Sequence, residues 1–141
     1  MSDSQRPSEI RTPQLVVRFL ALIGSLFIFH TLVLFYTAYM AEISQHELAR
    51  VVGVHLAGIL IVLGSFMALF VAHVAEGAAW GLYIWKRGLL PTFPESLYFS
   101  LSSLTAVGYG DVILPKESRI LGSLMATSGL IMFGCPPRLC F

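Results

Sequence analysis

Charged residues are distributed unevenly along the chain, and two long stretches contain none. Residues 19–41 carry no formal charge, and a second uncharged run covers residues 51–75. About 20 apolar residues are enough for a helix to cross the hydrocarbon core of a bilayer. The pattern therefore predicts two transmembrane helices, at 19–41 and at 51–85, because no proline interrupts the second before Pro91. A short polar connector is predicted over 42–50.

The two ends of the chain differ in character from these runs. Residues 1–18 are rich in polar side chains and are interpreted as a solvated tail. A third apolar run, 118–134, is near the lower length limit for a membrane span, and Pro136 and Pro137 follow it directly. Residues 135–141 are atypical for the end of such a helix, and we expect a truncated or altered C-terminus there.

Composition supports the same class of protein. Apolar residues make up 56% of the chain and charged residues 12%, against roughly 25% charged in soluble domains. The net charge is +1, and Lys and Arg are scattered along the chain, so the sequence predicts no nucleic-acid partner. It also gives no sign of a cofactor or of a small-molecule ligand. A multi-pass protein in a lipid bilayer is the expectation.

A short helix is predicted between the second and third apolar runs. Thr92-Phe93-Pro94-Glu95 has the form of a capping box, in which the Thr92 hydroxyl accepts from the Glu95 amide. The predicted helix, 93–104, is about 18 Å long, which is too short for a core of about 30 Å. We therefore expect a re-entrant element. Irregular chain at that depth is tolerated only where protein buries it or a watery cavity meets it.

The segment after this helix is Thr105-Ala106-Val107-Gly108-Tyr109-Gly110-Asp111. A dehydrated cation needs a ring of oxygens in place of its water shell, and backbone carbonyls can supply them if successive ones point the same way. An extended chain alternates their direction, so alternate residues must be inverted to positive φ. Glycine reaches those angles at little cost. Gly108 and Gly110 fit this requirement.

Val107-Gly108-Tyr109-Gly110-Asp111, after a short helix and between two spans, resembles the filter of the potassium channel pore domain. The resemblance covers residues 51–134 and implies an all-α membrane protein with a re-entrant pore helix and a selectivity-filter loop. In that reading the outer helix is 51–85, the pore helix 93–104, the filter 105–111 and the inner helix 118–134. Residues 19–41 are an extra span.

The resemblance assigns roles to individual residues. Backbone carbonyls of Ala106, Val107, Gly108, Tyr109 and Gly110 would coordinate ions, with K⁺ held at Val107, Gly108 and Tyr109. Thr105, Asp111, Tyr98 and Phe99 would support the filter, with the Tyr98 hydroxyl donating to Asp111 and the Tyr109 ring packing on pore-helix aromatics such as Phe99.

Two positions need separate comment. The family usually has threonine where this chain has Ala106, so we expect a weakened innermost site. Gly129 falls where the family's inner helix often bends, and it is interpreted either as a hinge or as a small residue that permits close packing.

Ionisable residues in the second span form another candidate site. His73, Glu76 and Trp80 share one helical face. Glu76 is expected near the outer end of its helix, as a partly hydrated carboxylate that pairs with His73 or faces a neighbouring chain. The competing hypothesis is a proton-sensing pair. His30 and His55 are interpreted as polar residues satisfied at helix interfaces.

One copy of the filter segment cannot surround an ion, so the resemblance implies a homotetramer in a cell membrane, such as the bacterial inner membrane. The implied function is passive K⁺ transport without catalysis, and no catalytic arrangement is visible in the spans. The alternative is a non-conducting subunit that joins and regulates full-length channel chains.

Overall fold

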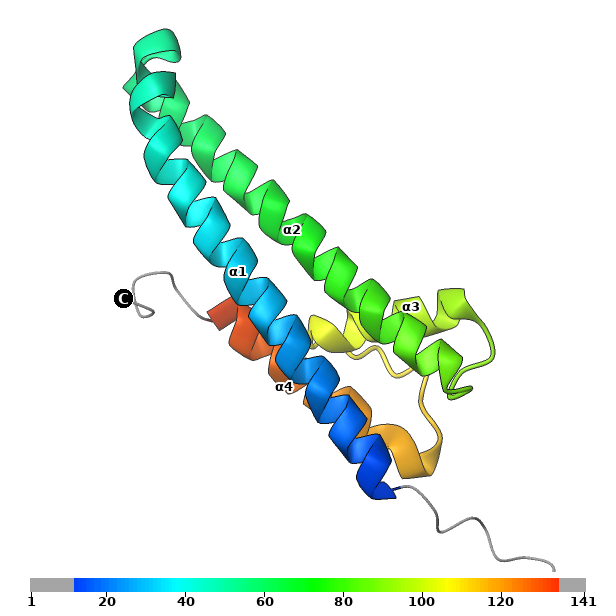
Figure 1. Ribbon diagram of the computed structural model, residues 1–141. Helices are drawn as coiled ribbons and strands as arrows, with labels where there is room; N and C mark the ends of the chain where they lie inside the picture. Colours follow the sequence, from blue (N-terminus) through cyan, green and yellow to red (C-terminus); the bar gives the residue numbers. More distant parts are fainter. Residues whose placement is uncertain (1–11, 135–141) are drawn as a thin grey trace, which may run out of the picture.

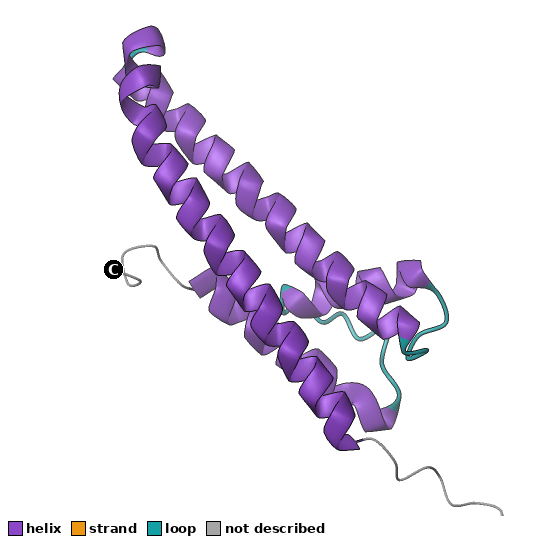
Figure 2. Ribbon diagram, in the orientation of Figure 1, coloured by secondary structure: helices purple, strands orange, loops and turns teal. Residues whose placement is uncertain are grey.

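The computed structural model describes residues 12–134, and this part of the chain is built from helices and loops without strands (Figure 2). The elements are α1 (Thr12–Val52), α2 (Val54–Lys86), α3 (Phe93–Leu104), the 3₁₀ turn η1 (Lys116–Ser118) and α4 (Arg119–Gly134).

Helices α1 and α2 form a long antiparallel hairpin (Figure 1). Gly53 alone separates them, with φ of 84°, an angle that glycine adopts without strain. The two helices have 41 and 33 residues, or about 60 and 50 Å at 1.5 Å per residue. Within them, Val17–Val52 and Val54–Lys86 are long and apolar enough to cross a membrane.

Two segments predicted as non-helical are helical. The connector expected over 42–50 continues α1 to Val52, because Glu, Gln, Leu, Ala and Arg favour helix and residues 42–52 contain neither glycine nor proline. An ion pair of 3.2 Å joins Glu47 to Arg50 on this turn. Part of the predicted polar tail is helical too, since α1 begins at Thr12, and proline is well tolerated in a first turn. The rest of the tail, and the predicted C-terminal irregularity at 135–141, lie outside the described residues.

The short helix α3 has the bounds that the sequence predicts for it. The Thr92 hydroxyl accepts from the Glu95 amide at 3.3 Å, which caps the helix start. A pair of glycines spaced four residues apart on α2, Gly77 and Gly81, faces Leu101 and Leu97 of α3. A Cβ at Gly81 would lie 2.9 Å from the Leu97 Cα. The missing side chains thus let the two helix backbones approach closely.

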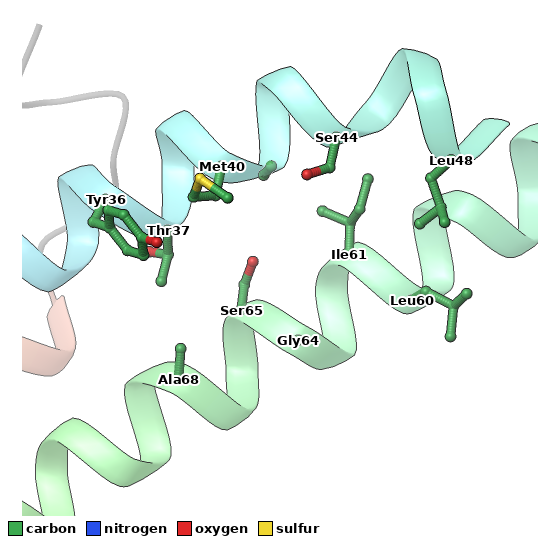
Figure 3. A pocket seen from close by; sticks show the side chains of 11 residues that line it. Tyr36, Thr37, Met40, Ser44, Leu48, Leu60, Ile61, Gly64, Ser65 and Ala68 are labelled. Carbon is green, nitrogen blue, oxygen red and sulfur yellow. The ribbon is translucent and has the colours of Figure 1, made fainter. Parts of the chain in front are cut away.

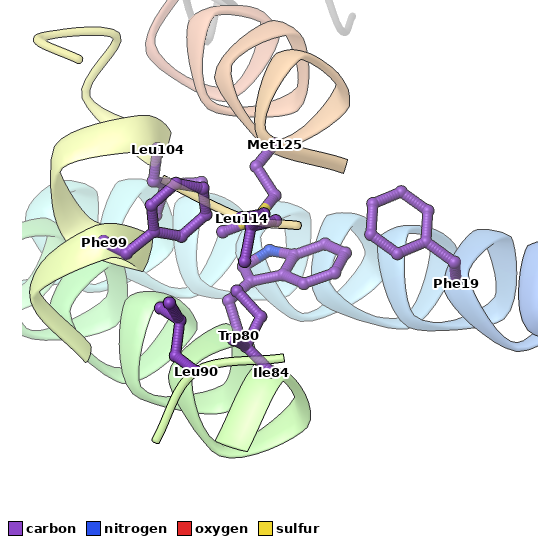
Figure 4. Packing of buried hydrophobic residues seen from close by; sticks show 8 residues of the cluster. All are labelled: Phe19, Trp80, Ile84, Leu90, Phe99, Leu104, Leu114 and Met125. Carbon is purple, nitrogen blue, oxygen red and sulfur yellow. The ribbon is translucent and has the colours of Figure 1, made fainter. Parts of the chain in front are cut away.

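The hydrophobic core lies where α1, α2, α3 and α4 meet, away from the hairpin tip (Figure 4). Trp80 is buried at its centre, and the Phe19 ring of α1 packs 4.7 Å from the Trp80 ring. This contact fastens the first helix to the remainder of the bundle. The buried cluster comprises Phe19, Trp80, Ile84, Leu90, Phe99, Leu104, Leu114 and Met125.

The half of the hairpin nearer its tip contains only α1 and α2 within the described chain (Figure 1). An open groove of about 350 Å³ lies between the two helices there. The Ser44 and Ser65 side chains extend into it from opposite sides, and Gly64 leaves its floor open (Figure 3).

Candidate functional site

The end of α3 and the start of the following loop are joined by a Schellman motif. The Ala106 amide donates to the Ser103 carbonyl at 2.9 Å, and the Val107 amide donates to the Ser102 carbonyl at 2.9 Å. Glycine usually occupies the left-handed position of this motif. Here Ala106 occupies it with φ of 57°. The loop therefore leaves the helix in a fixed direction, at some cost in backbone strain.

Positive φ recurs at every second residue of the loop. Ala106, Gly108 and Gly110 have φ of 57°, 54° and 79°. The sequence predicts the two glycine positions, but it gives no signal for Ala106, because alanine rarely adopts this region. Alternate inversion is the backbone pattern that allows successive carbonyls to face one side of the chain.

The loop is exposed along its whole length in the single chain. All residues of 105–111 are exposed, including 52% of Val107 and 72% of Tyr109. A cavity of about 400 Å³ separates the loop from α4, and both Ala106 and Gly108 line it. The loop therefore faces a cavity on the side toward α4, and its backbone is exposed on the other side.

A hydrogen bond ties the outer end of the loop to α3. The Tyr98 hydroxyl donates to Asp111 Oδ2 at 2.8 Å, as the resemblance implies. This bond lowers the pKa of the Asp111 carboxyl and raises the pKa of the Tyr98 hydroxyl. Asp111 Oδ1 also accepts from the Val112 amide at 3.0 Å. Both carboxylate oxygens are therefore engaged, which fixes the direction in which the chain leaves the loop.

A family model described as an ion channel matches residues 59–136, more than half of the chain. The chain belongs to this ion channel family. The resemblance to the potassium channel pore domain is thereby confirmed, and with it the all-α membrane fold. No curated protein and no solved structure matches the chain.

Two neighbouring aromatic residues of α3, Tyr98 and Phe99, lie in different surroundings. The Tyr109 ring stacks on Tyr98 of the same chain, with centroids 6.5 Å apart and planes 10° from parallel. Phe99 is buried in the core of the single chain, and its contact with Tyr109 stays a prediction. A Cβ at Gly122 of α4 would lie 3.1 Å from the Phe99 ring. In the single chain Tyr98 therefore lies against the loop, and Phe99 packs the short helix onto α4.

Thr105 closes the C-terminal end of α3. Its hydroxyl donates to the Leu101 carbonyl at 2.8 Å, and its amide donates to the same carbonyl at 3.1 Å. Two donors on one carbonyl hold the last turn of the helix tight, directly before the left-handed Ala106.

Gly129 of α4 lies against the carbonyl of Leu104, the last residue of α3. A Cβ at Gly129 would stand 2.8 Å from the Leu104 carbonyl carbon and nearer still to its oxygen. Of the two interpretations drawn from the sequence, the geometry favours close packing, because only glycine leaves room for this carbonyl. Bending at Gly129 remains a prediction.

The prediction for the surroundings of Glu76 is wrong. Its exposed fraction is 1%, and its Oε1 lies 2.9 Å from His30 Nδ1 on α1. The carboxylate is dry and paired across the hairpin, not hydrated and paired with His73. The reason is that α1 packs along α2 at this level and places His30 against the carboxylate, a contact between residues 46 positions apart. His30 is satisfied at a helix interface, as predicted.

Proposed function

We propose that this ion channel conducts K⁺ selectively, through a pore formed by four copies of the loop 105–111. The observation that carries the proposal is the alternation of positive φ at Ala106, Gly108 and Gly110. A chain inverted at every second residue can turn successive carbonyls to one side, and rings of such carbonyls replace the hydration shell of K⁺.

Exposure of the loop supports an assembly. Backbone at membrane depth must be buried by protein or must line a watery cavity, and the loop 105–111 is exposed in one chain. Further copies arranged about an axis beside the loop would cover one side of it and leave the carbonyls to the ions. Four copies are proposed because the potassium channel pore domain is built from four such filter segments.

Anchoring at both ends supports a rigid filter. The Schellman bonds to Ser102 and Ser103 hold the inner end, and the Tyr98–Asp111 bond holds the outer end. A filter must keep its diameter if its oxygens are to compensate for the loss of water around one ion and not another. The absence of a hydroxyl at Ala106 is proposed to weaken only the innermost site.

Ion flux from liposomes that contain the purified chain tests the proposal. K⁺-driven flux that Ba²⁺ blocks, and that a Na⁺ gradient does not produce, is expected. Gly108→Ala should reduce it, since Gly108 has a positive φ that strains an alanine. Gly58→Ala is the matched control, because a Cβ there meets nothing within 4 Å.

Two outcomes would contradict the proposal. Equal K⁺ and Na⁺ flux would refute selectivity, and undiminished flux in Gly108→Ala would exclude the loop as the filter.

A chain that conducts no ions would favour the alternative of a non-conducting subunit. Native mass spectrometry of the same sample then decides between a tetramer and a chain that requires other subunits. Reversal potentials of Ala106→Thr test the innermost site, and values unchanged from wild type would remove that assignment.

A further inference from the structure

Three ionisable side chains converge inside the helix bundle, away from the loop. They are His30 of α1 and His73 and Glu76 of α2. Each offers one atom suited to bind a metal, and these atoms lie within 4.8 Å of one another. His30 and Glu76 are buried, and the His30 and His73 rings meet edge to face with centroids 4.7 Å apart.

The hydrogen bonds within this cluster leave two atoms unsatisfied. Glu76 Oε1 pairs with His30 Nδ1, but Glu76 Oε2 is buried without a partner in the described chain. His73 Nδ1 lies 3.0 Å from the Leu69 carbonyl, which can only accept, so this nitrogen carries the hydrogen. The other ring nitrogen, Nε2, then presents a lone pair, and it too is buried without a partner among the described residues. Two buried acceptors without donors are costly unless a cation joins them.

We propose that His30, His73 and Glu76 bind a divalent transition-metal ion of the Zn²⁺ class. Two imidazoles and one carboxylate are a ligand set typical of zinc, and imidazole excludes Mg²⁺ and Ca²⁺, which prefer oxygen ligands. Ligands of one zinc ion lie about 3.4 Å apart, given bonds near 2.0–2.2 Å. Since the ligand atoms lie up to 4.8 Å apart, side-chain rotations must bring them closer by up to about 1.4 Å to share one zinc ion. The hydrogen shared by His30 and Glu76 is released as the metal binds.

The bond from His73 to the Leu69 carbonyl prepares this residue as a ligand. A second hydrogen bond on the far ring nitrogen fixes the tautomer and the orientation of a metal-binding histidine. The His73 ring is also held by Phe133 of α4, with centroids 4.1 Å apart and planes 26° from parallel. The site is thus partly preorganised before any metal arrives.

A cavity gives access to the cluster. It has a volume of about 610 Å³, and His30 and His73 line it together with Leu104, Thr105 and Phe133. A metal bound here would link α1 to α2 beside the C-terminal end of α3. The site therefore connects the additional first helix with the part of the channel that precedes the loop 105–111.

Zinc binding to the full-length chain in phosphatidylcholine nanodiscs tests the proposal. The affinity tag is removed, and Cys135→Ser and Cys140→Ser eliminate the two thiols as competing ligands. Titration calorimetry should give one Zn²⁺ per chain, undisturbed by excess Mg²⁺. His73→Gln and Glu76→Gln should each weaken binding at least about tenfold, the lower end of the effect of losing even an outer-shell partner. His46→Gln/His55→Gln removes the other two histidines and should leave the affinity unchanged.

X-ray absorption on the zinc-loaded chain needs no substitution of the three ligands, so it tests the proposal even where a variant fails to fold. The expected spectrum shows nitrogen and oxygen neighbours at 2.0–2.2 Å with imidazole scattering. Unchanged affinity in His73→Gln, a spectrum without imidazole, or no saturable binding would each overturn the proposal. Neither measurement involves ion flux, so the metal site succeeds or fails separately from K⁺ conduction.

Discussion

The Leu104 carbonyl, at the end of α3, rests against the Cα of Gly129 on α4. We predict that Gly129→Ala lowers the free energy of unfolding by about 1–3 kcal/mol, the usual cost of overpacking. The added methyl group would meet backbone atoms that cannot rotate away, so α4 must shift. Thermal unfolding in detergent measures the effect.

Gly24→Ala is the control for that experiment, since a Cβ at Gly24 meets nothing within 4 Å. It should be neutral or slightly stabilising, because alanine favours helix over glycine. Equal behaviour of the two variants would show that the contact between Leu104 and Gly129 does not constrain the helices.

The paired glycines of α2 should differ in their response to substitution. At Gly81 a Cβ would lie 2.9 Å from the Leu97 Cα, whereas at Gly77 it would meet chiefly the side chain of Leu101. A side chain can rotate and a backbone cannot. Gly81→Ala should therefore destabilise the chain more than Gly77→Ala, with Gly64→Ala as the unobstructed control. If Gly77→Ala lowered the unfolding midpoint more than Gly81→Ala, the result would mean that α2 and α3 separate easily at Gly81.

Ala106 and Gly88 occupy equivalent positions in two Schellman motifs. Gly88 has φ of 66°, and its amide donates to the Trp85 carbonyl at 2.9 Å. A left-handed alanine costs about 1–2 kcal/mol, and the flexibility of glycine in the unfolded chain offsets about 0.4–1 kcal/mol of that.

Ala106→Gly should consequently raise the free energy of unfolding by about 0.5–1 kcal/mol, and Gly88→Ala should lower it by a similar amount. Chemical denaturation of both variants beside wild type is the measurement. If Ala106→Gly were destabilising, the left-handed strain at Ala106 would be relieved in the assembled protein.

The Tyr98–Asp111 bond should make part of the stability depend on pH. The bond lowers the folded-state pKa of Asp111, so its contribution is present above the unfolded pKa, about 3.9, and is lost as pH falls through the folded value. Tyr98→Phe should thus unfold earlier than wild type near pH 7, and the difference should vanish in strong acid.

The Tyr98 hydroxyl works in the opposite direction. Its pKa is raised in the folded chain, so its contribution is present below its unfolded pKa, about 10, and is lost as pH rises through the folded value. Tyr39→Phe, on an exposed face of α1, is the control and should show no such window. Melting temperatures of the three proteins from pH 2 to pH 12 give the comparison. A difference between Tyr98→Phe and wild type that did not change with pH would show that the Tyr98–Asp111 bond does not stabilise the fold.

Local signals predict the short helix and most of the loop. Thr92, Pro94 and Glu95 mark the start of α3, and Gly108 and Gly110 mark two of the three inverted residues. Each signal involves residues a few positions apart, where local geometry decides the outcome. The left-handed Ala106 escapes prediction because the end of the helix imposes it and the residue type opposes it.

Long-range contacts are beyond such signals. His30 and Glu76 are 46 residues apart in the chain, and the sequence shows their pairing only once Gly53 is known to be the turn. Both lie 23 residues from Gly53, so an antiparallel hairpin brings them together. The four-residue spacing of Gly77 and Gly81 is a local signal that does indicate a close helix contact, although it does not show which helix packs there.

Because Gly53 alone joins α1 and α2, the uncharged runs of the two helices lie at different distances from the hairpin tip. The run in α1 ends at Ala41, about 18 Å from the tip, whereas that of α2 starts beside the tip itself. Glu42 and Glu47 therefore stand alongside the apolar residues 54–64 of α2. The hydrocarbon core of one bilayer cannot cover the uncharged runs of both helices in full. Moving a charged side chain into the hydrocarbon costs about 2.5–3.5 kcal/mol.

A bilayer that matches the uncharged run of α1 would leave an apolar flank of α2 outside the hydrocarbon core, and Val54, Ile59 and Val62 on this flank are largely exposed. Exposed apolar patches of this kind mark contact with another protein or with a membrane. The offset built into one turn thereby gives α2 an apolar surface near the hairpin tip that α1 alone does not cover.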